Sequence, residues 1–133
     1  AKGKVVYTQN CAICHQVRGA SGIAFGPDLG TIHNWLAKDI IVNVLDPNFS
    51  IAQGFDLWEL QLNEGSTLQG MIRNETSAAI TLHSAPGVER TINRQDIKSI
   101  KALNMSLMPG LEAQINPQQM ADLIAFLRDS RSE

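Results

Sequence analysis

The stretch that decides the fold is Cys11-Ala12-Ile13-Cys14-His15, near the amino end of the 133-residue chain. Two thiols separated by two residues and followed at once by an imidazole form the pattern of covalent c-type haem attachment. On the first turn of a helix, this spacing puts both sulfurs on one side, where they can add to the two vinyl groups of one porphyrin. His15 then lies under the iron as its proximal ligand. The motif predicts one haem c held by Cys11, Cys14 and His15.

Paired cysteines at this spacing also occur as redox-active dithiols, as half of a zinc site, or as an ordinary disulfide. A zinc site needs four ligands, and the remaining histidines, His33 and His83, stand far apart in the sequence. A thioredoxin-like dithiol follows a buried strand, whereas residues 2–10 have a helical pattern. The spacing therefore favours haem over these alternatives.

The composition and net charge limit the classes of partner that the chain could bind. The formal net charge is −2 and the pI is near 5.9, so the chain lacks the basic surface that nucleic acid or an anionic membrane requires. Hydrophobic residues make up 44% of the chain but aromatic residues only 5%, and a core so poor in rings gains from a large flat apolar cofactor. The composition is consistent with a haem protein and argues against nucleic acid or an anionic membrane surface as a partner.

The chain has no apolar stretch long enough to span a bilayer, and it begins without a basic and apolar signal sequence. Covalent haem attachment places a protein outside the cytoplasm. We therefore expect a periplasmic or otherwise extracytoplasmic protein without a transmembrane segment, whose signal sequence has been removed or left out.

Two terminal helices are predicted to cross. Gly3, Tyr7 and Cys11 recur every four residues on one helical stripe, and Gly3 would allow another helix to approach closely. Asn116-Pro117 opens a helix with proline at its first position. The apolar face of that helix comprises Met120, Leu123, Ile124 and Leu127, with Phe126 beside them.

A third helix is predicted over 34–45, with Asn34 or Thr31 as its N-cap and Asp46-Pro47 as its stop. Trp35 is a candidate wall of the haem pocket, although the high average burial of large aromatics favours the core.

From Phe55 the apolar period changes to two, which indicates strands. A hairpin is predicted over 58–72, followed by short strands over 78–83, 88–92 and 97–102. Turn residues separate these strands, so we expect an antiparallel meander of four or five strands. Removing residues 55–103 leaves a chain of the size of a compact helical haem domain. We therefore predict a single domain, 1–133, with a β-rich insertion at 55–103.

The second iron ligand is expected after the insertion. Asn104-Met105-Ser106-Leu107-Met108-Pro109-Gly110 offers two thioethers in a segment that proline and glycine keep non-helical. Methionine sulfur suits haem iron and, paired with histidine, raises the reduction potential. We choose Met108 over Met105, His33 or His83, because Pro109 would rigidify the backbone that delivers the Met108 sulfur.

The loop Gly26-Pro27-Asp28-Leu29 supplies the Pro27 carbonyl, which could accept a hydrogen bond from the other ring N–H of His15.

These residues resemble the class I cytochrome c family. The resemblance rests on the Cys11–His15 motif with Gly3 and Tyr7 upstream, on residues 26–29, and on Met108-Pro109 before a carboxy-terminal helix. With the insertion, the chain is similar to the haem-binding domain found in large bacterial chains that also carry dehydrogenase-like parts. In that family an acidic residue usually separates the proline from the glycine, whereas here Pro109 adjoins Gly110 directly. The resemblance implies a mainly α fold, with crossed terminal helices around the haem, and adds Leu29 to the haem-contacting residues.

The resemblance and the chemistry both imply one-electron transfer rather than catalysis. Iron with two protein ligands has no open position for substrate. We expect a periplasmic dehydrogenase as donor and another cytochrome or a terminal oxidase as acceptor. The alternatives are a haem-based sensor or binder of CO or NO, with a displaceable methionine, and a chain in which the β insertion is a docking module.

Overall fold

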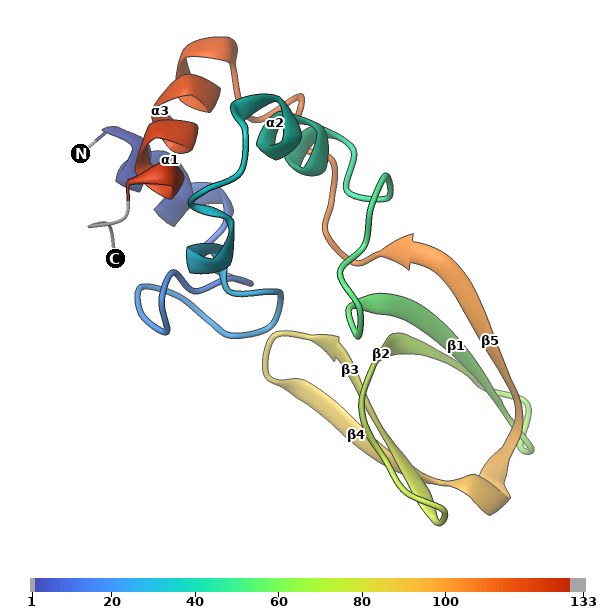
Figure 1. Cartoon of the computed structure of the whole chain (residues 1–133). Helices are drawn as coiled ribbons and strands as arrows, with labels where there is room; N and C mark the ends of the chain where they lie inside the picture. The colour runs from blue at the N-terminus through green and yellow to red at the C-terminus, as the bar shows by residue number, and fades with distance from the viewer. Residues whose placement is uncertain (1, 130–133) are drawn as a thin grey trace. The chain divides into compact units, whose positions relative to one another are not determined.

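The computed structural model describes residues 2–129, so residues 1 and 130–133 of the predicted 1–133 domain lie outside the described residues. Within the described range there are three α-helices, two short 3₁₀ helices and five strands (Figure 1). They are α1 Lys2–Asn10, η1 Leu29–Ile32, α2 Ala37–Leu45, β1 Asp56–Leu62, β2 Thr67–Glu75, β3 Ala79–Ala85, β4 Val88–Asn93, η2 Arg94–Asp96, β5 Ile97–Ser106 and α3 Pro117–Arg128.

The chain divides into two compact units. The helical unit comprises Ala1–Ser50 and Met108–Glu133, and the sheet unit comprises Ile51–Leu107. The sheet unit is therefore somewhat wider than the β-rich segment expected at 55–103. Each unit has its own hydrophobic core.

The prediction of a mainly α fold is wrong. The five described strands contain 7, 9, 7, 6 and 10 residues. The three described α-helices contain only 9, 9 and 12. The largest difference is in β5, which runs from Ile97 to Ser106 instead of stopping at residue 102. It continues because it pairs with β1 as far as Asp56, which lies opposite Ser106.

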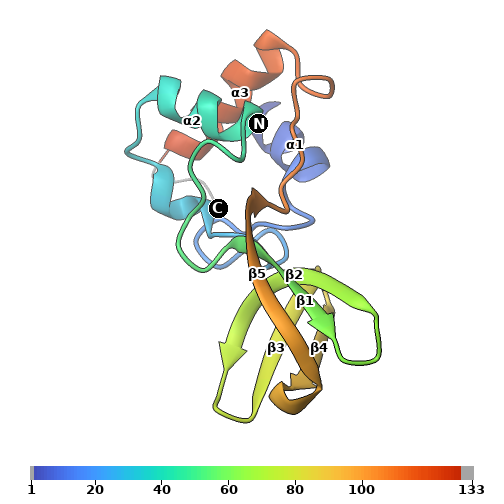
Figure 2. The same ribbon diagram turned by 90° about the vertical axis from the view of Figure 1, so that its right-hand side faces the viewer.

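All neighbouring strands in the sheet are antiparallel, in the order β4-β3-β2-β1-β5 (Figure 2). The first four strands form the predicted meander, but β5 returns to the side of β1 instead of extending the sheet beyond β4. The buried side chains of the sheet core are Leu60, Leu62, Ile80, Leu82 and Ile92. Leu60 and Leu62 alternate with the exposed Gln61, as the period-two pattern predicts for a strand with one buried face.

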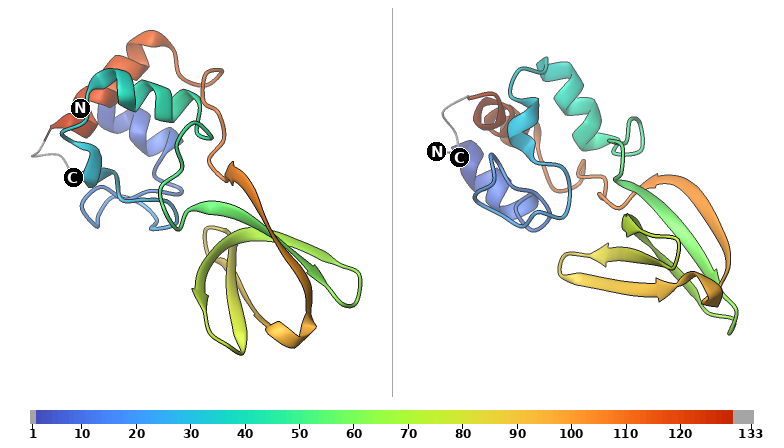
Figure 3. Two further views of the ribbon diagram at one scale, coloured as in Figure 1. Left: turned by 45° about the vertical axis from the view of Figure 1, so that its right-hand side comes forward. Right: turned by 60° about the horizontal axis from the view of Figure 1, so that its bottom comes forward.

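The predicted packing of the terminal helices is confirmed within the helical unit, where α1 lies beside α3 in each view (Figures 1 and 3). The Tyr7 and Phe126 rings lie 5.4 Å apart between their centroids. Asn116 caps α3 as predicted, since its side chain accepts the Gln119 N–H while the Gln119 side chain accepts the Asn116 N–H. The apolar face predicted for α3 is buried in the same core.

The start of the middle helix differs from the prediction. The cap of α2 is Leu36, which offers no side-chain hydrogen bond, rather than Asn34 or Thr31. Thr31 lies inside η1, where its hydroxyl donates to the Asp28 carbonyl at 2.8 Å. Thr31 therefore belongs to η1, whose own cap is Asp28, and the predicted stop of the middle helix at Asp46 is confirmed.

The close approach of α1 and α3 gives a first prediction. A Cβ atom on Gly3 would lie 1.9 Å from the Asp122 carbonyl oxygen and 2.6 Å from Phe126 Cβ, and both of these atoms are fixed by α3. We expect Gly3→Ala to lower the free energy of unfolding by about 3 kcal/mol, the upper end of the usual cost of overpacking. The measurement is the midpoint of urea unfolding. Lys4→Ala, at the exposed neighbouring position, is the control and should change stability by less than about 0.5 kcal/mol. Equal midpoints for the two variants would contradict this packing.

Candidate haem site

The motif at residues 11–15 follows α1 rather than opening a helix. α1 ends at Asn10, and residues 11–14 form turns. The N–H groups of Cys14 and His15 both donate to the Cys11 carbonyl, at 3.0 and 2.9 Å. The expectation of a helical first turn is therefore wrong. The turn still keeps the two cysteines and the histidine on one short, internally bonded piece of backbone.

The two thiols lie at the edge of the helical core. Cys11 is buried, with 6% of its surface exposed, and Cys14 is half-buried. Both carry free thiols. Burial raises the pKa of Cys11 to about 11, with a further contribution from Cys14, and burial also raises the pKa of Cys14. Catalytic dithiols lower the pKa of a cysteine to generate a thiolate, so this environment does not suit a thioredoxin-like dithiol.

His15 is buried and has a defined tautomer. Its Nδ1 lies 2.6 Å from the carbonyl oxygen of Pro27, as the sequence predicts. A carbonyl oxygen can only accept, so Nδ1 carries the proton and Nε2 carries a lone pair. Burial lowers the pKa of His15, while the Pro27 hydrogen bond and the Asp28 charge act in the opposite direction. A neutral imidazole with a basic Nε2 is the form that ligates iron, so the residues present fit a haem.

The loop after the motif packs directly on the imidazole. The N–H groups of Phe25 and Gly26 both donate to the Cys14 carbonyl. A Cβ atom on Gly26 would lie 2.6 Å from Cε1 and 3.0 Å from Nδ1 of His15, so only glycine leaves room for the ring. The glycine before Pro27 thus allows the backbone to lie against the proposed ligand.

The Tyr7 hydroxyl links the motif to the same loop. It lies 2.7 Å from the carbonyl oxygens of both His15 and Ser21, and its proton is shared between them. The side chain is fully buried, and burial, with smaller contributions from Cys11 and Asp28, raises the pKa of Tyr7 to about 12. Neither the helical stripe nor the family resemblance that includes Tyr7 predicts this polar role, because periodicity carries no information on where a hydroxyl points.

Met108 and Met105 belong to different units. Met108 is half-buried and packs against the core of the helical unit, which also contains Cys11. Met105 lies on β5 in the sheet unit, with 46% of its surface exposed. The segment after β5 is non-helical through Pro109 and Gly110, as the sequence predicts.

The remaining candidates lie in several environments. Leu29 is half-buried against the helical core, and its N–H donates to the Gln16 carbonyl at 2.8 Å. Trp35 is 39% exposed, so its assignment to the core is wrong. His33 is exposed, with Nδ1 3.0 Å from the Gly30 carbonyl oxygen. His83, on β3 of the sheet unit, lies 3.0 Å from a carboxylate oxygen of Glu89.

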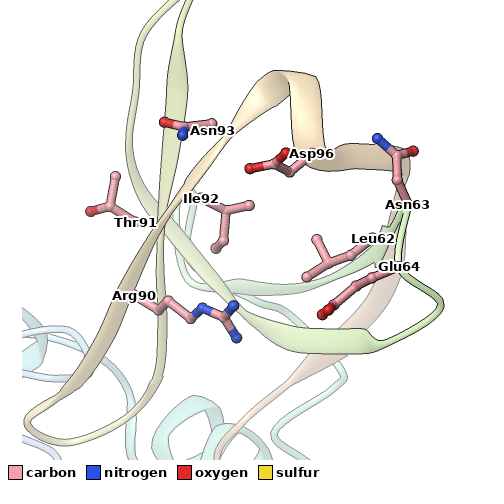
Figure 4. A pocket seen from close by; sticks show the side chains of 8 residues that line it. All are labelled: Leu62, Asn63, Glu64, Arg90, Thr91, Ile92, Asn93 and Asp96. Carbon is pink, nitrogen blue, oxygen red and sulfur yellow. The ribbon is translucent and has the colours of Figure 1, made fainter.

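A pocket of about 450 Å³ lies elsewhere, in the sheet unit (Figure 4). Its lining residues are Leu62, Asn63, Glu64, Arg90, Thr91, Ile92, Asn93 and Asp96. None of these is a cysteine, methionine or histidine, so the pocket offers no soft ligand for iron.

Over residues 2–129, no group of three or more His, Cys, Asp or Glu side chains could hold a metal ion, which gives the zinc alternative no support. No helix in that range is long and apolar enough to cross a membrane.

The buried imidazole with a free Nε2, next to two thiols on one turn, defines the class of site as one suited to haem. Residues 1–66 match the family model described as cytochrome c, and this match supports a c-type cytochrome. It also supports an electron-transfer type of haem protein rather than a catalyst, with haem c as cofactor and redox proteins as partners.

Comparisons with individual proteins add little. No curated protein matches the chain. Among solved structures, the chain is similar to the pleiotropic translational regulator Hfq, with 14% sequence identity and a TM-score of 0.34. That alignment covers 52% of this chain and 94% of the Hfq chain.

Proposed function

We propose that this chain is a monohaem c-type cytochrome that passes single electrons from a periplasmic dehydrogenase to another cytochrome or a terminal oxidase. The observation that carries the proposal is the hydrogen bond from His15 Nδ1 to the Pro27 carbonyl, next to two cysteines on one turn. It leaves Nε2 as the available ligand atom. The family match over residues 1–66 supports the same class, and proteins of this family are typically extracytoplasmic.

Four residues would hold the cofactor. Cys11 and Cys14 would supply the thioether links, His15 the proximal ligand, and Met108 the second axial sulfur. When bound, haem supplies a centre that gains and loses one electron, and a methionine opposite a histidine raises its potential. Met108 is preferred over Met105 because it belongs to the same compact unit as the motif.

The rest of the helical unit has supporting roles in this proposal. Pro27 fixes the orientation of the imidazole and increases the basicity of Nε2 through the Nδ1 hydrogen bond. Tyr7 holds the backbone of His15 to the loop. Leu29 and Trp35 are proposed to contact the haem, and the exposure of Trp35 leaves its indole ring available for this contact. The sheet unit is proposed as an insertion within one cytochrome domain.

The experiment is expression of the chain with a competent haem-ligation system, followed by intact mass and optical spectra of the oxidised and reduced protein. We expect a mass increase of one haem and a low-spin spectrum in both states. The Cys11→Ala/Cys14→Ala double variant is the control and should have the mass of the bare polypeptide. A colourless wild-type protein with that same mass would contradict the proposal. Rapid formation of a CO adduct at neutral pH would instead favour the gas-binding alternative, because it requires a displaceable sixth ligand.

A further inference from the structure

Asp28, the residue after Pro27, makes three short hydrogen bonds to backbone groups. Its Oδ1 accepts the N–H groups of Arg18 and Gly30, and its Oδ2 accepts the N–H of Gly19, each at 2.7 Å. The bond from Gly30 caps η1. The bonds from Arg18 and Gly19 have a different effect, because they join Asp28 to the segment that directly follows the haem motif.

The Arg18–Gly19 turn is shaped to hold a carboxylate. Both residues have positive φ, 53° and 74°, so their backbone differs from that of a strand or a right-handed helix. The turn is closed by two backbone hydrogen bonds between Val17 and Ala20, at 2.9 and 3.1 Å. Successive N–H groups in such a turn form a concave anion-binding site, which here is filled by the chain's own carboxylate. Hydrogen bonds to an ionised acceptor are also stronger than neutral ones.

These contacts fix the position of the Pro27 carbonyl. The carbonyl carbon of Pro27 is bonded to the Asp28 nitrogen, so little freedom separates it from the carboxylate that is held by Arg18 and Gly19. The next residue is held too, because the Leu29 N–H donates to the Gln16 carbonyl at 2.8 Å. The segment bearing the carbonyl is thus attached to both Gln16 and the Arg18–Gly19 turn, immediately after His15.

We propose that Asp28 is a positioning residue of the haem site: its carboxylate holds the Pro27 carbonyl on Nδ1 of His15 and thereby sets the basicity of Nε2. The part that concerns iron rests on the proposed function, whereas the part that concerns the imidazole does not. A simple helix cap would use the Gly30 N–H alone, and would not need the two donors on the far side of the loop. Burial is the largest single influence on the pKa of Asp28 and acts to raise it, but the three N–H groups and the Arg18 charge together lower that pKa, so the carboxylate is charged at neutral pH.

Two variants of Asp28 separate geometry from charge. Asp28→Asn keeps the size of the side chain but removes the charge and puts an NH₂ group against backbone donors. Asp28→Glu keeps the charge but displaces the carboxylate by one methylene. Asp39→Asn is the matched control, since Asp39 is exposed on α2 of the same unit, and the Asn43 side chain bonds to its backbone carbonyl, which the substitution keeps.

One readout is the solvent exchange of the His15 Nδ1 proton, measured by NMR on the chain with and without haem, and the other is the reduction potential of the haem-loaded chain. We expect exchange about tenfold faster in both Asp28 variants, the size expected for the loss of one hydrogen bond, and no change in Asp39→Asn. The potential should rise in both Asp28 variants, because a less basic imidazole stabilises the oxidised iron less.

Exchange at the wild-type rate in both Asp28 variants would overturn the proposal. Loss of folding in both, seen by circular dichroism, would also overturn it, because an essential structural role would replace the positioning role. If the wild-type chain takes up no haem, the proposed function fails, but proton exchange at His15 still decides the role of Asp28.

Discussion

Replacing His15 with alanine is expected to abolish the low-spin optical spectrum and to remove most of the covalently bound haem from the purified chain. His15 is the histidine of the described residues that is both buried and hydrogen-bonded through Nδ1 so that Nε2 is left free. Without this ligand, the iron loses its proximal nitrogen, and the cysteines lose the neighbour that completes the attachment motif. The measurements are intact mass and the spectra of both oxidation states.

His33→Ala is the matched control for this experiment. His33 lies in the same unit, but it is exposed and its Nδ1 contacts the Gly30 carbonyl oxygen. We expect this variant to keep the wild-type haem content and spectrum. If the two variants gave the same spectrum, whether both low-spin or both lost, the assignment of His15 as the specific ligand would have to be abandoned.

The sequence predicted the elements whose signals are local. The start of α3 at Asn116–Pro117 could be predicted because the capping box and the proline in the first turn involve only neighbouring residues of the sequence. The strands β1 to β4 could be predicted because one face of the sheet is buried. Successive side chains of a strand point to opposite faces, so apolar residues recur at every second position. The packing of α1 on α3 could be predicted because Gly3, which has no side chain, lies on the same helical stripe as Tyr7 and allows another helix to approach closely.

The errors came from interactions between distant parts of the chain. The full length of β5 depends on pairing with β1, so its own composition after residue 102 carries no signal for it. The mainly α prediction is wrong because the five strands together contain more residues than the three α-helices of the described range. Trp35 was assigned to the core from average burial, but that average reports nothing about the partners available at this position.

The candidate site was only partly accessible from the sequence. The spacing of Cys11, Cys14 and His15 marks the site because the chemistry itself demands it. The contributions of Tyr7 and Asp28 depend on where a hydroxyl and a carboxylate meet backbone groups many residues away, which spacing does not reveal. A short loop with an aspartate after a proline was the only available signal for Asp28, and by itself it indicates no more than a turn.

The Met108→Ala variant is expected to lose the absorption band of iron–sulfur ligation and to open the sixth position of the iron to CO. Met108 offers a soft sulfur from the helical unit, and alanine offers no ligand atom. The potential should fall by on the order of 0.1 V, a small part of the roughly 0.8 V range that axial ligands cover, since thioether ligation favours the reduced iron. The measurements are the optical spectrum, the CO-binding rate and a redox titration.

Met105→Ala tests the competing assignment in the same assay. Met105 is exposed on β5, so its truncation should leave stability within about 0.5 kcal/mol of the wild type and leave the band in place. If the band survives in Met108→Ala and disappears in Met105→Ala, the sulfur comes from the sheet unit, and the choice of Met108 is wrong. If it survives in both single variants and disappears only in the double variant, the two methionines replace each other, and the rigidity attributed to Pro109 does not select between them. Only loss of the band in Met108→Ala, with Met105→Ala unchanged, supports a fixed sulfur ligand supplied by the segment that returns from the sheet to α3.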